Sequence, residues 1–279
     1  QESTSKTVSS KGGVTKRNYE LQATDYEENR HYFLGQFFRD TYDQNMSLLP
    51  LIASGIEITK IEVWMTNKRS NYDNARNILA FSDLGEATRE EMQRPDYWKG
   101  MDGAAPANGV NSLYSNLCAY DELRQIELVT TGMEGFDPEM KSGRDFEKIE
   151  SARMLQPSEY SLNSSLGYLS LKTKIDDDCV LAVAFQYTKG GQTYQVGEFA
   201  SDNAEDATRS LYVKLLKSTT GDPKNKLWDL MMKNIYSLGV TNLQQSNFTM
   251  QIQYLNDSVG TYTSYINAAP ISRDLLIKV

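Results

Sequence analysis

The stretch 179–199, CVLAVAFQYTKGGQTYQVGEF, is the part of the sequence that best predicts the fold. It begins with an apolar run of strand length and continues with apolar residues at alternating positions. Lys189, Gly190 and Gly191 join the two halves, and paired glycines suit the positive φ angles of a tight primed turn. We therefore predict an antiparallel β-hairpin here.

More strand patterns lie on both sides of this hairpin. The clearest is 55–67, where isoleucine, valine and methionine alternate with polar residues and a phase slip at Thr59 and Lys60 suggests a bulge. We expect it to pair with a second run at 77–86. Further strands are predicted over 146–155, 166–172, 210–218, 247–255 and 260–266.

Helical spacing is confined to a few segments. Aromatic residues recur every three to four positions over 25–43, where Asp25 and Glu28 resemble a capping box, so we predict one or two helices there. Apolar spacing also predicts helices over 111–125 and, with a mixed pattern, over 227–239. The glycine-rich stretch 87–110 is predicted to be a long surface loop.

Together these patterns predict an α+β fold, made mainly of antiparallel, sandwich-like sheets with a few short helices and a helical N-terminal segment. Residues 1–18 are rich in serine, threonine and lysine, and we expect a linker or flexible tail there. Residues 19–279 are expected to form one soluble mixed domain, with two packed lobes at 19–145 and 146–279 as the alternative.

Charge and hydropathy exclude several classes of function. The net charge of −8 and the pI near 4.9 argue against partners such as nucleic acid or anionic lipid. The longest apolar run is too short to cross a bilayer as a helix, so direct membrane insertion is not expected. The chain starts without Met and without an apolar signal core, which suggests the interior of a longer polypeptide.

The residues that could carry catalysis are few. His31 is the only histidine, and it is expected inside an aromatic helix without a G-x-S-x-G motif or a catalytic cysteine signature. Phosphate-binding loops of the GxxxxGK[ST] or GxGxxG type are missing from the sequence. We therefore predict no enzyme activity, no catalytic residue, no cofactor-binding residue and no cofactor.

Acidic and sulfur-containing residues give no metal prediction either. Asp176, Asp177 and Asp178 offer oxygen ligands, but the calcium-loop spacing is absent and an acidic turn is the better interpretation. The acidic pairs at 27–28 and 90–91 are interpreted as solvated helix faces rather than glycosidase carboxylates. The basic pair at 68–69 is too short to form a patch. Cys118 and Cys179 are expected to be buried free thiols, with a disulfide between them as the alternative.

Aromatic residues leave one binding alternative open. We expect the cluster Tyr32, Phe33, Phe37, Phe38 and Tyr42 to face the core, with a partner-binding face as the alternative. A carbohydrate- or peptide-binding module would need exposed aromatic residues in a groove, and its candidates are Trp64, Trp98 and Trp228.

Several long strings resemble the repeated soluble region of the SprA (Sov) family. They are DYEENRHYFLGQFFRDTYD (25–43), SGIEITKIEVWMTNKRSNYDNARNILAFSDLGE (54–86), ARMLQPSEYSLNSSLGYLSL (152–171), VLAVAFQYTKGGQTYQVGEF (180–199) and LWDLMMKNIYSLG (227–239). This family is the outer-membrane translocon of type IX secretion in Bacteroidetes, linked also to gliding motility, and its very large β-barrel is interrupted by soluble insertions.

The resemblance implies that this chain is one such insertion at the cell surface, in the outer membrane. It would cap or shape the protein exit and dock partners: the remainder of the parent barrel, other type IX components and secreted client proteins. The resemblance implies the extracellular side, with the periplasmic side as the alternative, and it brings no catalytic residues. The other functional hypothesis is the carbohydrate- or peptide-binding module of a bacterial cell-surface protein.

Overall fold

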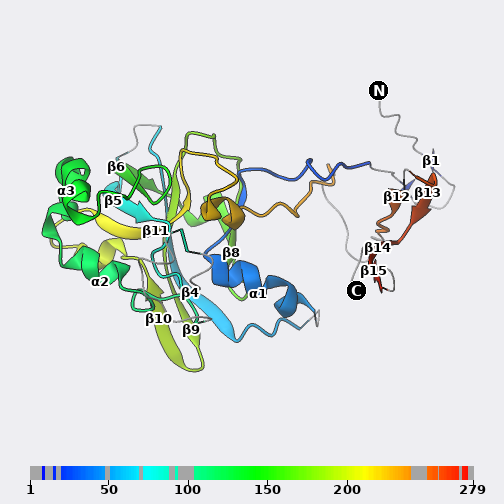
Figure 1. The fold of residues 1–279 in the computed structure, drawn as a ribbon, viewed down its shortest axis with the longest axis horizontal. Helices are drawn as coiled ribbons and strands as arrows, with labels where there is room; N and C mark the ends of the chain where they lie inside the picture. Colours follow the sequence, from blue (N-terminus) through cyan, green and yellow to red (C-terminus); the bar gives the residue numbers. More distant parts are fainter. Residues whose placement is uncertain are drawn as a thin grey trace.

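The computed structural model describes residues 8–9, 15–16, 20–47, 51–68, 72–87, 92–93, 104–239, 250–256, 258–269 and 272–275. At its centre is a closed barrel of five strands (Figure 1). Around the barrel the strand order is β9 (Leu181–Lys189), β11 (Leu211–Lys217), β5 (Arg76–Phe81), β6 (Phe146–Met154) and β4 (Ile56–Met65), and β4 pairs back with β9.

The closed barrel corrects the predicted sandwich. β9 pairs with β4 along its whole length and with β11 only over Leu181–Val183, so the sheet curls back onto itself rather than stacking on a second sheet. β10 (Gln192–Val196) extends the other half of β9 as the predicted hairpin. Neighbouring strands are antiparallel, as predicted, except that β11 runs parallel to β5.

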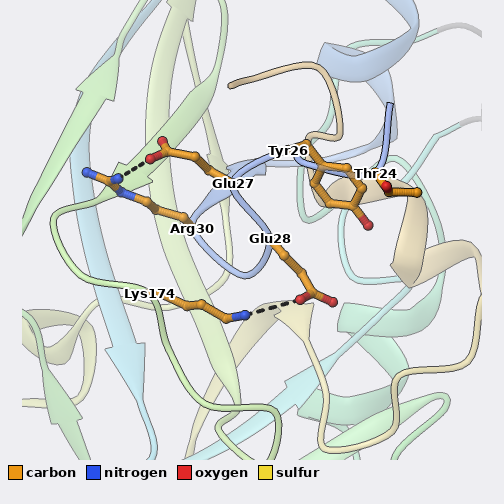
Figure 2. Close-up of a pocket in the computed structure, with 6 residues that line it drawn as sticks. All are labelled: Thr24, Tyr26, Glu27, Glu28, Arg30 and Lys174. Atoms are coloured by element: carbon orange, nitrogen blue, oxygen red, sulfur yellow. Dashed lines mark hydrogen bonds and ion pairs between the residues drawn. The ribbon is translucent and has the colours of Figure 1, made fainter. Parts of the chain in front are cut away.

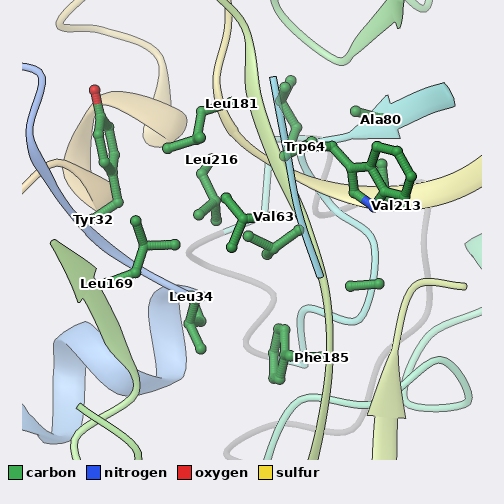
Figure 3. Close-up of a cluster of buried hydrophobic side chains, with 14 of the residues drawn as sticks. Tyr32, Leu34, Val63, Trp64, Ala80, Leu169, Leu181, Phe185, Val213 and Leu216 are labelled. Carbon is green, nitrogen blue, oxygen red and sulfur yellow. The ribbon is translucent and has the colours of Figure 1, made fainter. Parts of the chain in front are cut away.

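Trp64 is the largest of the fully buried side chains among the described residues. Trp64 has 0% exposure, and it lies beside Ala80 and Val213 in Figure 3. Its cross-strand partner on β9 is Ala182. Ala152 is also fully buried, and small side chains leave room for the indole in a narrow barrel. The sequence of alternating large and small residues therefore fits a closed interior.

Two layers cover the outside of the barrel. One contains the sheet β3 (His31–Phe33), β8 (Tyr168–Leu171) and β7 (Tyr160–Asn163), together with helix α1 (Gln36–Met46). The Phe38 ring packs edge-on against Phe185 of β9. The other layer is helical and contains α2 (Leu113–Cys118), η2 (Asp121–Arg124), η3 (Ile126–Leu128) and α3 (Val129–Phe136). It buries a second apolar cluster against Phe81, Phe146 and Tyr212.

The shorter elements complete the list. They are the 3-10 helices η4 (Pro157–Glu159), η5 (Ala200–Asn203) and η6 (Lys226–Leu230), and the paired strands β1 (Val8–Ser9) with β2 (Thr15–Lys16), β12 (Tyr254–Asn256) with β13 (Thr261–Thr263), and β14 (Tyr265–Ala269) with β15 (Ser272–Leu275). The β1–β2 pair thus lies within the predicted linker.

Most of the strand predictions are confirmed. β4 has a register shift between Ile58 and Lys60, at the predicted bulge. Gly190 and Gly191 both have positive φ, as the primed turn requires. The predicted pairing of 55–67 with 77–86 is wrong, because β6 lies between β4 and β5. Residues 240–249, which hold part of the predicted strand 247–255, lie outside the described residues; β12 and β13 follow.

The helix predictions are confirmed in part. A helix does not begin at Asp25; residues 31–33 form β3, and α1 begins only after Gly35. All three residues of β3 are buried, and a strand that is covered on both faces can carry aromatic residues at a spacing that is also typical of a helix. The 111–125 prediction corresponds to α2 and η2, α3 was not predicted, and in 227–239 only η6 is helical.

Candidate functional site

His31 lies at the centre of a three-residue hydrogen-bond chain. Its Nδ1 is 2.7 Å from the Ser170 hydroxyl on β8, and its Nε2 is 2.8 Å from a Glu27 carboxylate oxygen. The His31 side chain is 8% exposed. If Ser170 donates to Nδ1, then Nε2–H donates to Glu27, which is the order of roles in a serine–histidine–acid triad. The sequence did not predict this arrangement, because Glu27 and Ser170 carry no motif.

The surroundings of Ser170 do not suit acyl transfer. Ser170 lies on β8, the middle strand of its sheet, opposite His31 on one side and Ser161 on the other. The backbone N–H of the next residue, Leu171, donates to the Arg30 carbonyl. An oxyanion needs preorganised hydrogen-bond donors beside the nucleophile, and here the backbone N–H of Leu171 already has an acceptor within the protein. The hydrogen bonds of Glu27, His31 and Ser170 therefore connect β3 and β8 to the segment that precedes β3.

Glu27 is one of six residues that line a surface groove of about 460 Å³ (Figure 2). Its walls carry two ion pairs: Glu27 with Arg30 at 2.5 Å, and Glu28 with Lys174 at 3.1 Å. Both carboxylates already have a cation beside them, so they are not a glycosidase pair facing each other across a substrate cleft. Glu90 and Glu91, the other acidic pair considered, lie outside the described residues, as does Arg69.

The acidic turn 176–178 holds lysine side chains. Asp176, Asp178 and Cys179 place their ligand atoms within 4.8 Å of one another, but the Lys68 ammonium pairs with both carboxylates. Its hydrogen bonds to Asp178 and then Asp176 raise the Lys68 pKa, and the same contact lowers the pKa of Asp178. A protein cation thus occupies the position in which a metal would bind.

A second cavity, of about 270 Å³, lies where β11 ends. The segment before β3 contributes Glu28 and Asn29 to its wall, and β3 contributes Tyr32. The acidic turn contributes Asp177, and η6 contributes Trp228. The loop after β11 adds Ser218, Thr219, Thr220 and Gly221 to the wall. Since Glu28 lines both hollows, the 460 Å³ groove and this cavity are neighbours.

The three tryptophans differ in what they can bind. Trp64 is sealed inside the barrel, so it cannot contact a ligand. Trp98 lies outside the described residues. Trp228 is half-buried and lines the 270 Å³ cavity. In the aromatic cluster, Tyr32, Phe33 and Phe38 are buried, as predicted, and Phe37 and Tyr42 pack against the same core.

Two buried carboxylates join the elements around β11, and no motif in the sequence indicates them. The Glu198 carboxylate accepts hydrogen bonds from both Arg124 Nη atoms, at 2.6 and 2.7 Å. It also accepts hydrogen bonds from the Tyr114 hydroxyl and the Tyr212 backbone N–H. The Arg124 guanidinium also lies 3.6 Å from the Tyr212 ring centre. Glu86 makes a similar buried pair with Lys214. Both sites fix the fold.

The cysteines are free thiols, with Cys179 buried and Cys118 exposed. The expectation that both would be buried is therefore wrong for Cys118. This residue ends α2, where its side chain turns outward next to Arg124, whose Nη2 is 3.7 Å from the sulfur.

The chain enters and leaves the barrel body at one place. The Glu27 amide donates to the Ile235 carbonyl at 2.8 Å, and the Tyr236 hydroxyl donates to the Ala23 carbonyl at 3.0 Å. Further in, the Met232 amide donates to the His31 carbonyl at 2.9 Å. In Figure 1 the blue segment before β3 and the orange segment after η6 run side by side.

In the described part of the chain, no helix combines the length and the apolar character that a membrane span requires. No curated protein sequence matches this chain. A family model described as "Motility related/secretion protein", SprA_N, matches residues 1–189. That match covers more than half of the sequence and agrees with the resemblance found in the strings above. The chain therefore belongs to the SprA family of motility-related and secretion proteins.

Proposed function

We propose that residues 20–239 form an insertion domain of a giant outer-membrane translocon of type IX secretion. Its role is structural: it caps or shapes the exit through which secreted proteins leave, and it docks partners there. The proposed partners are the remainder of the parent barrel, other type IX components and secreted client proteins, on the extracellular side of the outer membrane. The domain acts without nucleic acid and without entering the membrane itself.

The paired entry and exit segments are the observation that carries this proposal. A domain inserted into another fold must begin and end close together, since the host strands on either side are neighbours. Here the 2.8 Å hydrogen bond from Glu27 to Ile235 joins the two segments directly. The closed barrel supports the same role, because a sheet closed on itself leaves few open edges to pair with client strands.

We also propose that the domain has no catalytic activity and no cofactor. The Glu27–His31–Ser170 chain is the strongest candidate for catalysis among the described residues, and the committed backbone around Ser170 argues against it. A fluorophosphonate probe tests this directly. We expect no covalent label on Ser170, and labelling that disappears in Ser170→Ala would contradict the proposal.

An excision in the full-length parent tests the structural role. Residues 28–234 are replaced by a short glycine–serine linker, which joins the paired segments at Glu27 and Ile235. The matched control is the full-length parent with Glu150→Gln, a change at a side chain that is 64% exposed. We expect the shortened parent to reach the outer membrane at the control level, and secretion of client proteins to fall.

Two results would contradict the proposal. If the shortened parent is lost from the outer membrane while the control is retained, the region belongs to the fold of the host barrel. If the shortened parent accumulates and secretes at the control level, the domain has no role at the exit.

A further inference from the structure

We propose that the 270 Å³ cavity at the end of β11 binds one neutral sugar ring, the hexose-type unit of a glycan. This inference goes beyond the structural role proposed above and does not depend on it. It rests on the size of the cavity, the compensation of the charges around it, and the side chains of its wall.

The cavity has the size and the walls for one ring. Its volume equals that of about nine waters at ~30 Å³ each, which is enough for a single hexose and too little for a longer oligosaccharide. Trp228 is half-buried and supplies aromatic surface, while Tyr32, Leu216 and Met231, each less than 5% exposed, complete the apolar part of the wall. A sugar ring has an apolar C–H face that packs on such surfaces.

Two lysines near the cavity already donate hydrogen bonds to carbonyl groups of the protein. The Lys217 ammonium donates to the carbonyls of Asp177, Cys179 and Ser218 at 2.6, 2.8 and 3.1 Å. The Lys233 ammonium donates to the carbonyls of Trp228 and Met231 at 2.8 and 3.0 Å. Lys217, the lysine that lines the cavity, therefore has no spare N–H for an anionic ligand, whereas Lys233 keeps one of its three N–H groups but does not line the cavity. Both ammonium groups would repel a cationic ligand.

The acidic side chains favour hydroxyl groups. Glu28 is paired with Lys174 at 3.1 Å. The Oδ1 atom of Asp177 accepts a hydrogen bond of 2.6 Å from the Asn29 side-chain amide. Its Oδ2 atom can accept further hydrogen bonds from a ligand. A carboxylate accepts hydrogen bonds from adjacent hydroxyls of a sugar, which donate and accept in turn. Thr219 and Thr220 add hydroxyl groups to the same wall.

Gly221 gives a way to close the cavity without straining the backbone. Its φ is not positive, and a Cβ at this position would stand 3.7 Å from Trp228 Cζ3, an ordinary contact. Gly221→Leu should therefore extend a side chain along Trp228 into the cavity. Asp176→Asn is the matched control, because Asp176 neighbours the cavity but does not line it.

The test is an NMR titration of the intact, ¹⁵N-labelled chain with methyl α-glucoside and, separately, methyl α-mannoside. N-acetyl-lysine amide serves as the peptide-like probe. For at least one glycoside we expect saturable shifts of the Trp228 indole N–H at millimolar concentration, at least tenfold weaker binding in Gly221→Leu, and unchanged binding in Asp176→Asn. The spectrum of each variant verifies its fold.

Three results would overturn the proposal. The glycosides could cause no saturable shift, or Gly221→Leu could bind them as well as the parent chain does, which would place binding elsewhere. Saturation by the lysine probe alone would assign the cavity to a basic peptide side chain instead.

Discussion

The Glu86 carboxylate lies 2.6 Å from the Lys214 ammonium, and both side chains are almost completely buried, at 3% and 2% exposure. Glu86 also accepts the backbone N–H of Gln36 in the first turn of α1, at 3.2 and 3.3 Å. A carboxylate at a helix N-terminus is favourable because the helix dipole is positive there. Glu86 thus joins α1 to β11, and Lys214 also donates to the Ser82 carbonyl.

Removal of one partner of this pair should be strongly destabilising. Lys214→Met leaves the Glu86 charge buried without its cation, and such a change costs about 3–5 kcal/mol in the free energy of unfolding. Urea denaturation measures it. Lys214→Met with Glu86→Leu should lose less than the sum of the two single variants, because neither charge remains. Additive losses would mean that the two side chains do not interact.

The sequence predicts the structural features that depend on residues close together in the chain. The β9–β10 hairpin and the bulge in β4 follow from local alternation and paired glycines, and both were found. The buried pair was not predictable, because Glu86 and Lys214 are 128 positions apart in the sequence and charged residues are usually exposed. The parallel contact of β11 with β5 is equally long-range.

Helix α3 was missed for a different reason. It contains Gly132 and Gly135, which disfavour a helix by propensity. In the fold, a Cβ on Gly132 would stand 3.1 Å from Leu123 Cδ2, and one on Gly135 would overlap the Tyr120 hydroxyl. The glycines therefore allow α3 to approach its neighbours closely. Candidate sites were harder still to predict, since Glu27, His31 and Ser170 meet only through tertiary structure.

Alanine substitutions at two glycines distinguish the energetic cost of backbone strain from that of steric overlap. Gly167 and Gly190 have φ of 65° and 58°, but a Cβ on Gly167 would overlap the Phe38 ring, whereas one on Gly190 would meet nothing within 4 Å. Gly190→Ala should cost about 1–2 kcal/mol from the left-handed conformation alone. Gly167→Ala should cost about 1–3 kcal/mol more, because the core must move. Equal losses in thermal or urea unfolding would contradict this account of Phe38.

Alkaline pH should unfold the protein cooperatively. Burial is the main cause that raises the pKa of Tyr32, Tyr187 and Tyr212 well above the ordinary value near 10. Because the folded-state pKa exceeds the unfolded one, the stabilisation is complete below about pH 10 and is lost as the pH rises further. Each of these tyrosines should lower the free energy of unfolding by about 1.4 kcal/mol per pH unit in that range.

The tyrosine effect can be measured by urea unfolding between about pH 8 and about pH 11.5. Tyr187→Phe should make the loss per pH unit shallower by about 1.4 kcal/mol, although it also removes the hydrogen bond to the Pro106 carbonyl. An unchanged slope in Tyr187→Phe would show that Tyr187 ionises equally in both states.

The matched family segment should not fold by itself. It ends at residue 189, before β10 and β11, and β11 lies between β9 and β5 in the barrel. A chain of residues 20–189 would expose the apolar edges of both strands, so we expect aggregation or a non-cooperative melt. Residues 20–239 should unfold in one cooperative transition. A cooperative transition in the shorter chain would mean that β11 is dispensable.

The size and location of the native polypeptide test the central claim most directly. Antibodies against residues 25–43 are used to isolate the protein from fractionated cells, and mass spectrometry of the isolated material identifies the polypeptide and what copurifies with it. The account predicts an outer-membrane polypeptide several times longer than this chain, together with other secretion components. A mature protein near 31.6 kDa, free of the membrane, would contradict it.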